Sequence, residues 1–278
     1  MPELPEVQAH AERLDAMFRG ALLDGFRPLT FTVAKTAVPD PADVVGVACS
    51  GVGRRGKLLL VGFAPYCFVV HLMQGGRLVP DEKQSPKPRG GQARWRFADG
   101  RALLLTEAGT ERKAGVWLRD TDPLIQEPLD HLGPDADLVT VDELSSLLGG
   151  TSMRLHGFLR DQHQIAGLGR RLANEVCHQA KLSPFATCSK LDADAVARMH
   201  EAIGTCIDES LAYERSRDDM SKSKDRPGAV HHRVGEPCPV CGDAIRSVEY
   251  NAYTVAYCPT CQTSGKVLAD NTTSKFLK

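Results

Sequence analysis

The chain has 278 residues, 42% hydrophobic and 25% charged, a composition typical of a folded protein and a length sufficient for two ordinary domains. No apolar run approaches the ~20 residues of a membrane helix, and no basic region followed by an apolar stretch begins the chain, so we expect a cytoplasmic protein with no membrane partner. The formal net charge of -1 excludes a strongly basic protein, so any polyanion must be bound by local basic patches.

The first element that the sequence predicts is a helix over residues 5–19. Val7, Leu14, Met17 and Phe18 recur there at helical spacing, and Gly20 is a plausible terminator. The first residues of the chain would therefore lead directly into a helix.

Two interpretations of the preceding letters, MPELPEV, stay open. In the structural one, Pro5 occupies the first turn of the helix, and Glu3 and Glu6 favour the positive end of its dipole. In the chemical one, removal of Met1 leaves Pro2 as a free secondary amine beside the carboxylate of Glu3.

From about residue 21 to 120 the pattern changes to short β-rich runs separated by Gly, Pro and Asp turns. Such regular spacing predicts an antiparallel sandwich or barrel. The polar interval 80–92, rich in Pro and Gly, is expected to be an exposed loop. The expected strands are ALLDGF, DVVGVACSGV, KLLLVGF, CFVVHL, RWRF, RALLLT and GVWL.

After about residue 135 the sequence predicts helices. Thr140 and Glu143 have capping-box spacing before ELSSLL. An amphipathic helix is expected after Ser189, from the spacing of Val196, Met199, Ile203 and Ile207.

Between these helices, two helical stretches flank a turn formed by Gly167, Leu168 and Gly169, with Arg170 and Arg171 opening the second stretch. A basic, glycine-opened helix start offers backbone N–H groups to a phosphate. A tight helix–helix connection with exposed arginines is the alternative. The charged segment 214–233 has few large apolar residues and is interpreted as a linker.

Four cysteines form two Cys-x-x-Cys knuckles, CPVC at 238–241 and CPTC at 258–261. Their spacing predicts a hairpin around one tetrahedral, structural zinc, in preference to a redox centre. Two short strands with a turn near Asn251 and Ala252 would connect the knuckles. The remaining cysteines are expected in the core: Cys49, Cys67, Cys177, Cys188 and Cys206.

Together these motifs resemble the Fpg/Nei (formamidopyrimidine-DNA glycosylase and endonuclease VIII) family of bifunctional DNA glycosylases and abasic-site lyases, over nearly the whole chain. The segments that carry the resemblance are PELPEV, GRRGKLLL at 53–60, HLMQGGRL at 71–78, TEAGTERKAGVWL at 106–118, RDQHQIAGLG at 160–169, GEPCPVCG and YCPTCQ.

The resemblance implies catalytic roles for Pro2, Glu3, Glu6 and Lys57. Pro2 would attack C1′ of a damaged nucleotide, because an α-amino group, with a pKa of ~7.7–8.0, is often neutral at physiological pH. Glu3 would protonate the sugar ring oxygen and move protons during elimination. Glu6 would support the site, with helix capping as an equal alternative, and Lys57 would contact phosphate and assist elimination.

The resemblance also implies DNA contacts that fill the gap left by an extruded base. Met73 matches the wedge residue, although a core position is an equal alternative. Arg112 matches a second member of the wedge, but Ala114 stands where a phenylalanine is expected. The intercalating set is therefore incomplete.

Two further departures concern phosphate contacts. Gly167 and Gly169 match the phosphate-holding turn, yet Arg170 replaces the usual asparagine. Tyr253 stands near the position of an arginine at the zinc hairpin, and Lys266 could supply the missing charge.

We therefore predict an α+β fold with four parts. These are an N-terminal β-sandwich with a catalytic N-terminal helix (1–130), a helix-two-turn-helix domain (135–215), a linker or lesion-recognition loop (216–234) and a zinc ribbon (235–278). The expected protein is a monomer of the bacterial nucleoid. It would excise damaged bases from double-stranded DNA and nick abasic sites by β,δ-elimination. A catalytically silent DNA-damage-binding protein is the alternative, and the lesion stays open.

Overall fold

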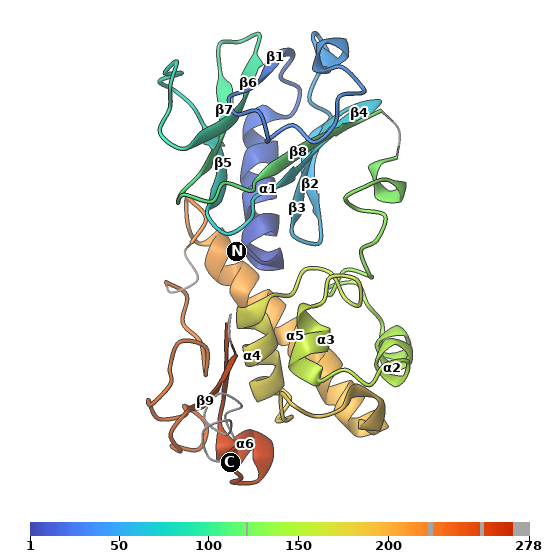
Figure 1. Cartoon of the computed structure of the whole chain (residues 1–278), viewed down its shortest axis with the longest axis vertical. Helices are drawn as coiled ribbons and strands as arrows, with labels where there is room; N and C mark the ends of the chain where they lie inside the picture. The colour runs from blue at the N-terminus through green and yellow to red at the C-terminus, as the bar shows by residue number, and fades with distance from the viewer. Residues whose placement is uncertain (121, 222–224, 251–252, 269–278) are drawn as a thin grey trace. The chain divides into compact units, whose positions relative to one another are not determined.

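The computed structural model describes residues 1–120, 122–221, 225–250 and 253–268. The chain divides into two compact units, unit 1 (Met1–Leu132) and unit 2 (Gly133–Lys278), each of which is described by itself (Figure 1). No helix within the described residues combines the length and the apolar character that a bilayer span requires. The finer boundaries at residues 216 and 235 stay a prediction.

Unit 1 contains two antiparallel four-stranded sheets, which confirms the predicted β-sandwich class. One sheet has the strand order β1-β6-β7-β5 and the other β2-β3-β4-β8. The strands are β1 (Leu23–Pro28), β2 (Gly51–Arg55), β3 (Leu58–Phe63), β4 (Tyr66–His71), β5 (Gly76–Pro80), β6 (Gly91–Phe97), β7 (Ala102–Glu107) and β8 (Gly115–Arg119).

Aromatic side chains join the two sheets face to face. Phe68 of β4 lies with its ring centroid 5.0 Å from that of Phe26 in β1 and 5.7 Å from that of Trp95 in β6. Phe63 of β3 contacts Phe97 of β6 at 6.4 Å. Such pairs, buried away from water, hold the two layers in register.

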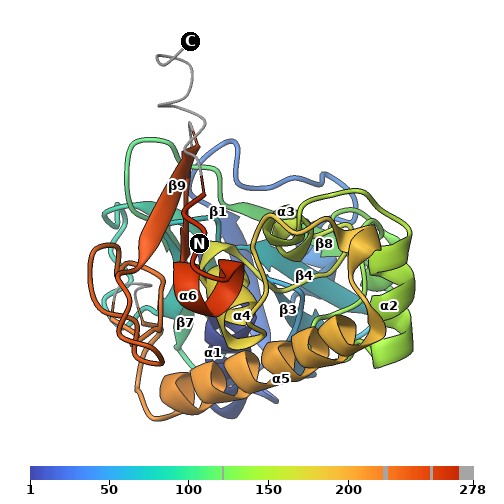
Figure 2. The same cartoon turned by 90° about the horizontal axis from the view of Figure 1, so that it is seen from below.

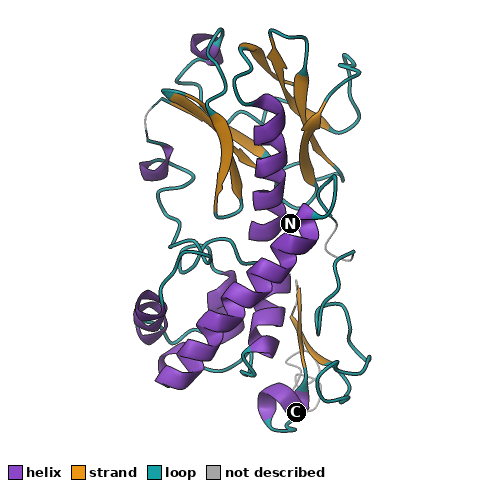
Figure 3. Cartoon of the chain, turned by 180° about the vertical axis from the view of Figure 1, so that it is seen from behind, coloured by secondary structure: helices purple, strands orange, loops and turns teal. Residues whose placement is uncertain are grey.

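The helix α1 (Leu4–Phe18) ends as predicted, with Gly20 at a φ of 81° just beyond it. Figure 3 shows α1 running between the two groups of strands. His10 bonds through Nε2 to the carbonyl of Leu78 in β5 at 2.6 Å, while the Arg54 side chain in β2 donates to Gln8 at 2.9 Å. One helix is therefore fixed to both sheets.

The predicted strands of unit 1 differ from the structure in two places. The run DVVGVACSGV becomes a strand only at Gly51, because its start forms the 3-10 helix η1 (Pro41–Val44), which Asp40 caps. The strand β5 was missed, since GRLVP is too short and too mixed in polarity to stand out. The polar loop predicted over residues 80–92 is confirmed for residues 81–90, whereas Pro80 ends β5 and Gly91 and Gln92 begin β6.

Unit 2 contains five α-helices within its described residues. Thr140 caps α2 in a capping box with Glu143, as predicted. Helix α5 begins at Ala193 and not directly after Ser189, because Asp192 is its N-cap and accepts from the N–H of Ala195. In Figure 2 the long helix α5 runs past α4 toward α2. The helices are α2 (Val141–Gly149), α3 (Leu155–Arg160), α4 (Arg170–Gln179), α5 (Ala193–Arg215) and α6 (Pro259–Thr263), with 3-10 turns η2 (Pro123–Ile125, in unit 1) and η3 (Cys188–Lys190).

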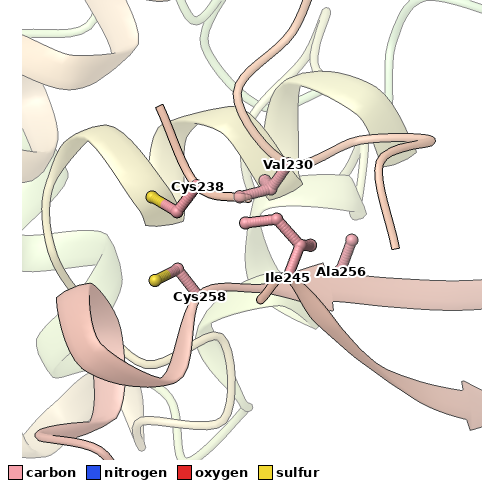
Figure 4. Close-up of a cluster of buried hydrophobic side chains, with 5 residues drawn as sticks. All are labelled: Val230, Cys238, Ile245, Ala256 and Cys258. Atoms are coloured by element: carbon pink, nitrogen blue, oxygen red, sulfur yellow. The ribbon is translucent and has the colours of Figure 1, made fainter. Parts of the chain in front are cut away.

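A short hairpin follows, formed by β9 (Arg246–Tyr250) and β10 (Tyr253–Tyr257). The turn predicted at Asn251 and Ala252 lies outside the described residues. The hairpin has a small core in which Val230, Ile245 and Ala256 pack beside two knuckle cysteines (Figure 4). A core this small needs another source of stability.

The segment predicted as a linker is, in its second half, packed against α4. The carboxylate of Glu175 accepts hydrogen bonds from the backbone N–H groups of Ala229, Val230 and His231, at 2.7 to 3.2 Å. Arg171 donates to the carbonyl of Pro227. The linker interpretation is therefore wrong for residues 227–231, because their backbone is hydrogen-bonded to the side chains of Arg171 and Glu175 on α4.

Candidate active site and metal centre

Strand register gathers several predicted site residues at one end of the sheet β2-β3-β4-β8. Leu58, the first residue of β3, pairs with His71, the last of β4, which in turn pairs with Gly115, the first of β8. We call this place, where the ends of β2 and β4 and the starts of β3 and β8 meet, the sheet end. The β2–β3 turn, the turn after β4 and the segment that precedes β8 all lie there.

The start of α1 lies at the sheet end as well. Asp15, near the last turn of the helix, accepts from the backbone of Val52 near the start of β2, whereas Gln8 is bonded to Arg54 close to the β2–β3 turn. The helix therefore runs toward the sheet end as it is followed back to its first residue. Pro2 and Glu3 precede that residue directly.

Pro2 and Glu3 are both buried in the chain that retains Met1. Glu3 is 5% exposed and Glu6 is 4% exposed. The backbone N–H of Glu3 donates to Glu6 Oε2 at 3.0 Å, in a reciprocal capping box. The capping interpretation of Glu6 is confirmed, and a catalytic part for either carboxylate stays a proposal.

Lys57 occupies the β2–β3 turn and is buried, at 5% exposure. The turn has only two residues, because Arg55 pairs with Leu58, and Gly56 takes a φ of 55° that favours glycine. Burial, and then the charge of Lys57, lower the pKa of His71 to about 4. His71 is therefore neutral at physiological pH, and Lys57 is the nearby cation.

Met73 lies in the turn after β4 and is not a core residue. Its backbone has a φ of 53°, uncommon for a non-glycine residue, and its N–H donates to His71 Nδ1 at 3.1 Å. The side chain is half-buried. Arg112 is exposed in the segment before β8, and Ala114 is buried, its N–H bound to Glu107.

In unit 2 the glycine turn is braced by one side chain. Gln162 accepts from the N–H of Gly167 at 3.0 Å and donates to the carbonyl of Leu168 at 2.8 Å. Gly167 has a φ of 105°, and Gly169 is the N-cap of α4. Arg170 follows as the first residue of the helix and is exposed.

Sequence reasoning missed a cation beside the zinc hairpin. The guanidinium carbon of Arg160, the last residue of α3, lies 3.9 Å from the centroid of the Tyr253 ring. His156 also stacks on Tyr253, at 5.9 Å between centroids. No local pattern joins residues so far apart in the chain. Lys266 is exposed beyond the hairpin.

The four knuckle cysteines converge on one point. Their sulfur atoms all lie within 4.8 Å of one another, with 3.9 Å between Cys238 and Cys261 and 3.4 Å between Cys241 and Cys258. A tetrahedron with Zn–S bonds of ~2.3 Å has edges of about 3.8 Å, so the four ligands fit zinc. Figure 4 shows the sulfur atoms of Cys238 and Cys258 on the same side of the hairpin core.

The surroundings of the cluster suit a metal thiolate. His178 Nε2 of α4 lies 3.3 Å from Cys238 Sγ, and the N–H of Val240 donates to the same sulfur at 3.5 Å. Such hydrogen bonds orient ligands and balance their charge. The five other cysteines are buried, as predicted.

Comparison with known proteins agrees with this geometry. Residues 1–116 match the family model of the formamidopyrimidine-DNA glycosylase N-terminal domain, and residues 235–263 match that of the zinc finger found in FPG and IleRS. The formamidopyrimidine-DNA glycosylase of Pelotomaculum thermopropionicum is 31% identical over 278 residues, covering 94% of this chain and 99% of that protein. The chain belongs to the Fpg/Nei family. Its four cysteines accordingly hold one structural zinc.

Other Fpg relatives agree. That of Chloroflexus aurantiacus is 30% identical over 276 residues, covering 94% of this chain and 98% of its own. An uncharacterised Fpg-like protein of Mycobacterium tuberculosis is 43% identical over 149 residues, covering 53% of this chain and 94% of its own. A crystal structure of Lactococcus lactis Fpg bound to abasic-site DNA has a TM-score of 0.83 at 21% identity, covering 94% of this chain and 99% of that one, which supports the Fpg fold.

The predicted site residues thus form separate groups within the two units of this Fpg chain. Pro2, Glu3, Lys57, Met73 and Arg112 belong to the sheet end of unit 1. Gly167, Gly169 and Arg170 form the start of α4 in unit 2. His71 was missed, although its place in HLMQGG, two residues before Met73, could have drawn attention to it.

Proposed function

We propose that the mature chain is a bifunctional DNA glycosylase and abasic-site lyase that acts as a monomer on double-stranded DNA with damaged bases or abasic sites. The observation that carries this proposal is the sheet end. The start of the chain lies there with two buried side chains, the carboxylate of Glu3 and the lysine of the β2–β3 turn, Lys57. The named activity of the Fpg relatives is consistent with it.

The proposed first step is attack by the nitrogen of Pro2 on C1′ of the damaged nucleotide. Because Met1 precedes Pro2, this nitrogen belongs to a peptide bond until Met1 is removed. An N–C1′ bond then forms, the glycosidic bond breaks, and the base leaves with its electron pair. Protonation of the ring oxygen by Glu3 opens the sugar and gives an iminium.

The iminium makes the C2′ proton acidic, so its removal expels the 3′ phosphate by β-elimination. A second elimination expels the 5′ phosphate, and water releases Pro2 from the remaining sugar. Lys57 would neutralise charge on a phosphate while it leaves. The neutral state of His71 leaves Lys57 as the cation of this pair.

The DNA must expose the damaged nucleotide to this end of unit 1. Met73, half-buried on a left-handed backbone, is proposed as the wedge that enters the vacated stack, because its turn holds it out of the core. Arg112 would accompany it. Because Ala114 has a small side chain, the wedge lacks one aromatic ring. We expect this difference to change which lesion is preferred and not which reaction is catalysed.

The direct test is borohydride trapping. The protein is incubated with a duplex that contains one abasic site, in the presence of reductant, and the products are separated by denaturing electrophoresis. The expected result is a covalent protein–DNA adduct and, without reductant, a strand nicked by both eliminations. Pro2→Gly, which replaces the ring nitrogen by a primary amine, should lower the yield of adduct, and Glu3→Gln should lower the yield of nicked product.

Lys190→Ala serves as the matched control, because this exposed lysine of unit 2 belongs to no predicted site. It should leave the adduct yield unchanged. Tight binding of the duplex by the wild-type protein with no adduct would contradict the lyase and would favour the silent DNA-damage-binding protein.

A further inference from the structure

Unit 2 contains a guanidinium that lies over the face of an aromatic ring. Arg160 ends α3 and Tyr253 begins β10, so the pair joins the helices to the zinc hairpin. The 3.9 Å between the guanidinium carbon and the ring centroid is a close cation–π contact. His156, one turn before Arg160 on the same helix, lies near the same ring with its plane inclined by 20°.

This arrangement leaves the donors of Arg160 available. A cation–π contact does not use the guanidinium N–H groups as hydrogen-bond donors, so these groups can still bind an oxyanion with two oxygens. Within the described part of the chain, no carboxylate or carbonyl pairs with the guanidinium of Arg160. Its neighbour Asp161 instead caps the N–H of His163 at 3.0 Å.

The surroundings are positive. Arg170 is exposed at the start of α4, and the backbone there bonds to His156. Burial, and then the charge of Arg160, lower the pKa of His156 to about 3. The pKa of His231 is also lowered to about 3, first by burial and then by the charges of His232, Arg171 and Arg170. The nearest carboxylate on α4, that of Glu175, is occupied by three backbone N–H groups.

We infer that Arg160 binds a phosphate of the DNA backbone and that Tyr253 is the residue that positions it. Tyr253 itself carries no charge, and the sequence offered only Lys266 as a cation near the hairpin. The structure brings Arg160 to that place. This inference rests on the proposed function, because it takes duplex DNA as the ligand.

The alternative is a purely structural role, in which the contact only holds the zinc hairpin against α3. Both roles predict that loss of the pair lowers stability. They differ in the salt dependence of DNA binding, since each phosphate-bound cation contributes about 0.9 to the slope of log K against log salt concentration. A purely structural contact leaves the slope of log K against log salt concentration unchanged.

The test is fluorescence anisotropy with a duplex that carries a non-cleavable tetrahydrofuran abasic analogue, at several KCl concentrations. Arg160→Ala should weaken binding about tenfold at moderate salt and reduce the slope by about one charge. Arg160→Lys should keep most of the slope. Tyr253→Phe, which keeps the ring, should bind as the wild type does, whereas Tyr253→Leu should weaken binding several-fold.

The double variant Arg160→Ala with Tyr253→Leu should bind no more weakly than Arg160→Ala alone, because the ring acts through the arginine. Lys190→Ala, which removes a cation elsewhere in unit 2, should leave the slope unchanged. Zinc content and melting temperature are measured for every variant, so that a variant with a damaged hairpin is recognised.

An unchanged slope in folded, zinc-loaded Arg160→Ala would overturn the inference while leaving the glycosylase proposal intact. Full affinity in Tyr253→Leu would overturn the positioning role of Tyr253. Failure of the wild-type protein to bind the duplex at all would overturn both proposals. Binding with the expected slopes but no borohydride adduct would sustain Arg160 and reject the lyase.

Discussion

At the scale of single residues, the sheet end combines a buried cation with a histidine that stays neutral. Lys57 lies in the β2–β3 turn and His71 ends the neighbouring strand β4, and the low pKa of His71 follows from its burial first and from Lys57 second. An uncharged His71 can accept the hydrogen bond from the N–H of Met73. The same neutral ring therefore allows a charged Lys57 and fixes the backbone of the proposed wedge.

This arrangement predicts that unit 1 loses stability in mild acid. The pKa of His71 is about 4 in the folded chain, against ~6.5 when unfolded, so between these values the unfolded state binds more protons. Stability should therefore fall as the pH drops from 7 to 5, by about 2 kcal/mol through this one group. Both tryptophans, Trp95 and Trp117, belong to unit 1, so urea unfolding followed by their fluorescence measures it.

His71→Asn keeps an acceptor at the position of Nδ1 for the N–H of Met73 and removes the titration. It should show a smaller loss of stability than the wild type over the same pH interval. Equal losses in the two proteins would show that His71 does not titrate as its burial implies.

At the scale of elements, tight turns decide where the site residues lie. The two-residue β2–β3 turn places Lys57, and the turn from Leu72 to Gly76 places Met73. In the second turn the N–H of Gly76 donates to the carbonyl of Leu72 at 2.9 Å. The backbone comes so close there that a Cβ at Gly76 would lie 2.0 Å from the Leu72 oxygen.

Gly76→Ala should therefore cost about 1–3 kcal/mol or more of unfolding free energy, because the clash is with backbone and not with a flexible side chain. It should also lower nicking, since Met73 and its turn must shift. Gly53→Ala is the matched control, as nothing lies within 4 Å of its added Cβ. Tryptophan fluorescence during urea unfolding gives both free energies, and equal stability of the two variants would contradict the close approach.

The sequence predicted those elements that local chemistry specifies. The helical spacing of apolar residues up to Phe18 and the capping box at Thr140 indicated two helices, and the cysteine knuckles marked the zinc hairpin. The strand β5 and the stack of Arg160 on Tyr253 escaped notice, because both depend on residues brought together by the fold. Spacing along the chain carries no trace of such long-range partners.

At the scale of the whole molecule, the chain consists of two units with different sources of stability. Unit 1 is held by the aromatic core between its sheets, whereas the hairpin of unit 2 has a core of a few small residues and four thiolates. Zinc binding therefore supplies much of the folding free energy of the hairpin. The tryptophans report on unit 1 alone.

Removal of zinc should unfold the hairpin and leave unit 1 folded. In Cys261→Ser, or after chelation, we expect loss of bound zinc and rapid proteolysis within residues 235–268, with the tryptophan unfolding curve unchanged. Cys206→Ala should keep its zinc, because Cys206 lies outside the four-cysteine cluster. A parallel loss of the tryptophan transition would show that the two units do not unfold independently.

The nitrogen that forms the adduct tests the central claim most directly. The borohydride-reduced complex with abasic DNA is digested with protease and nuclease, and the sugar-linked peptide is sequenced by mass spectrometry. The account predicts a peptide that begins at Pro2, lacks Met1 and carries the reduced sugar remnant on its first nitrogen. A remnant attached to Lys57 or another lysine, or active protein that retains Met1, would contradict it.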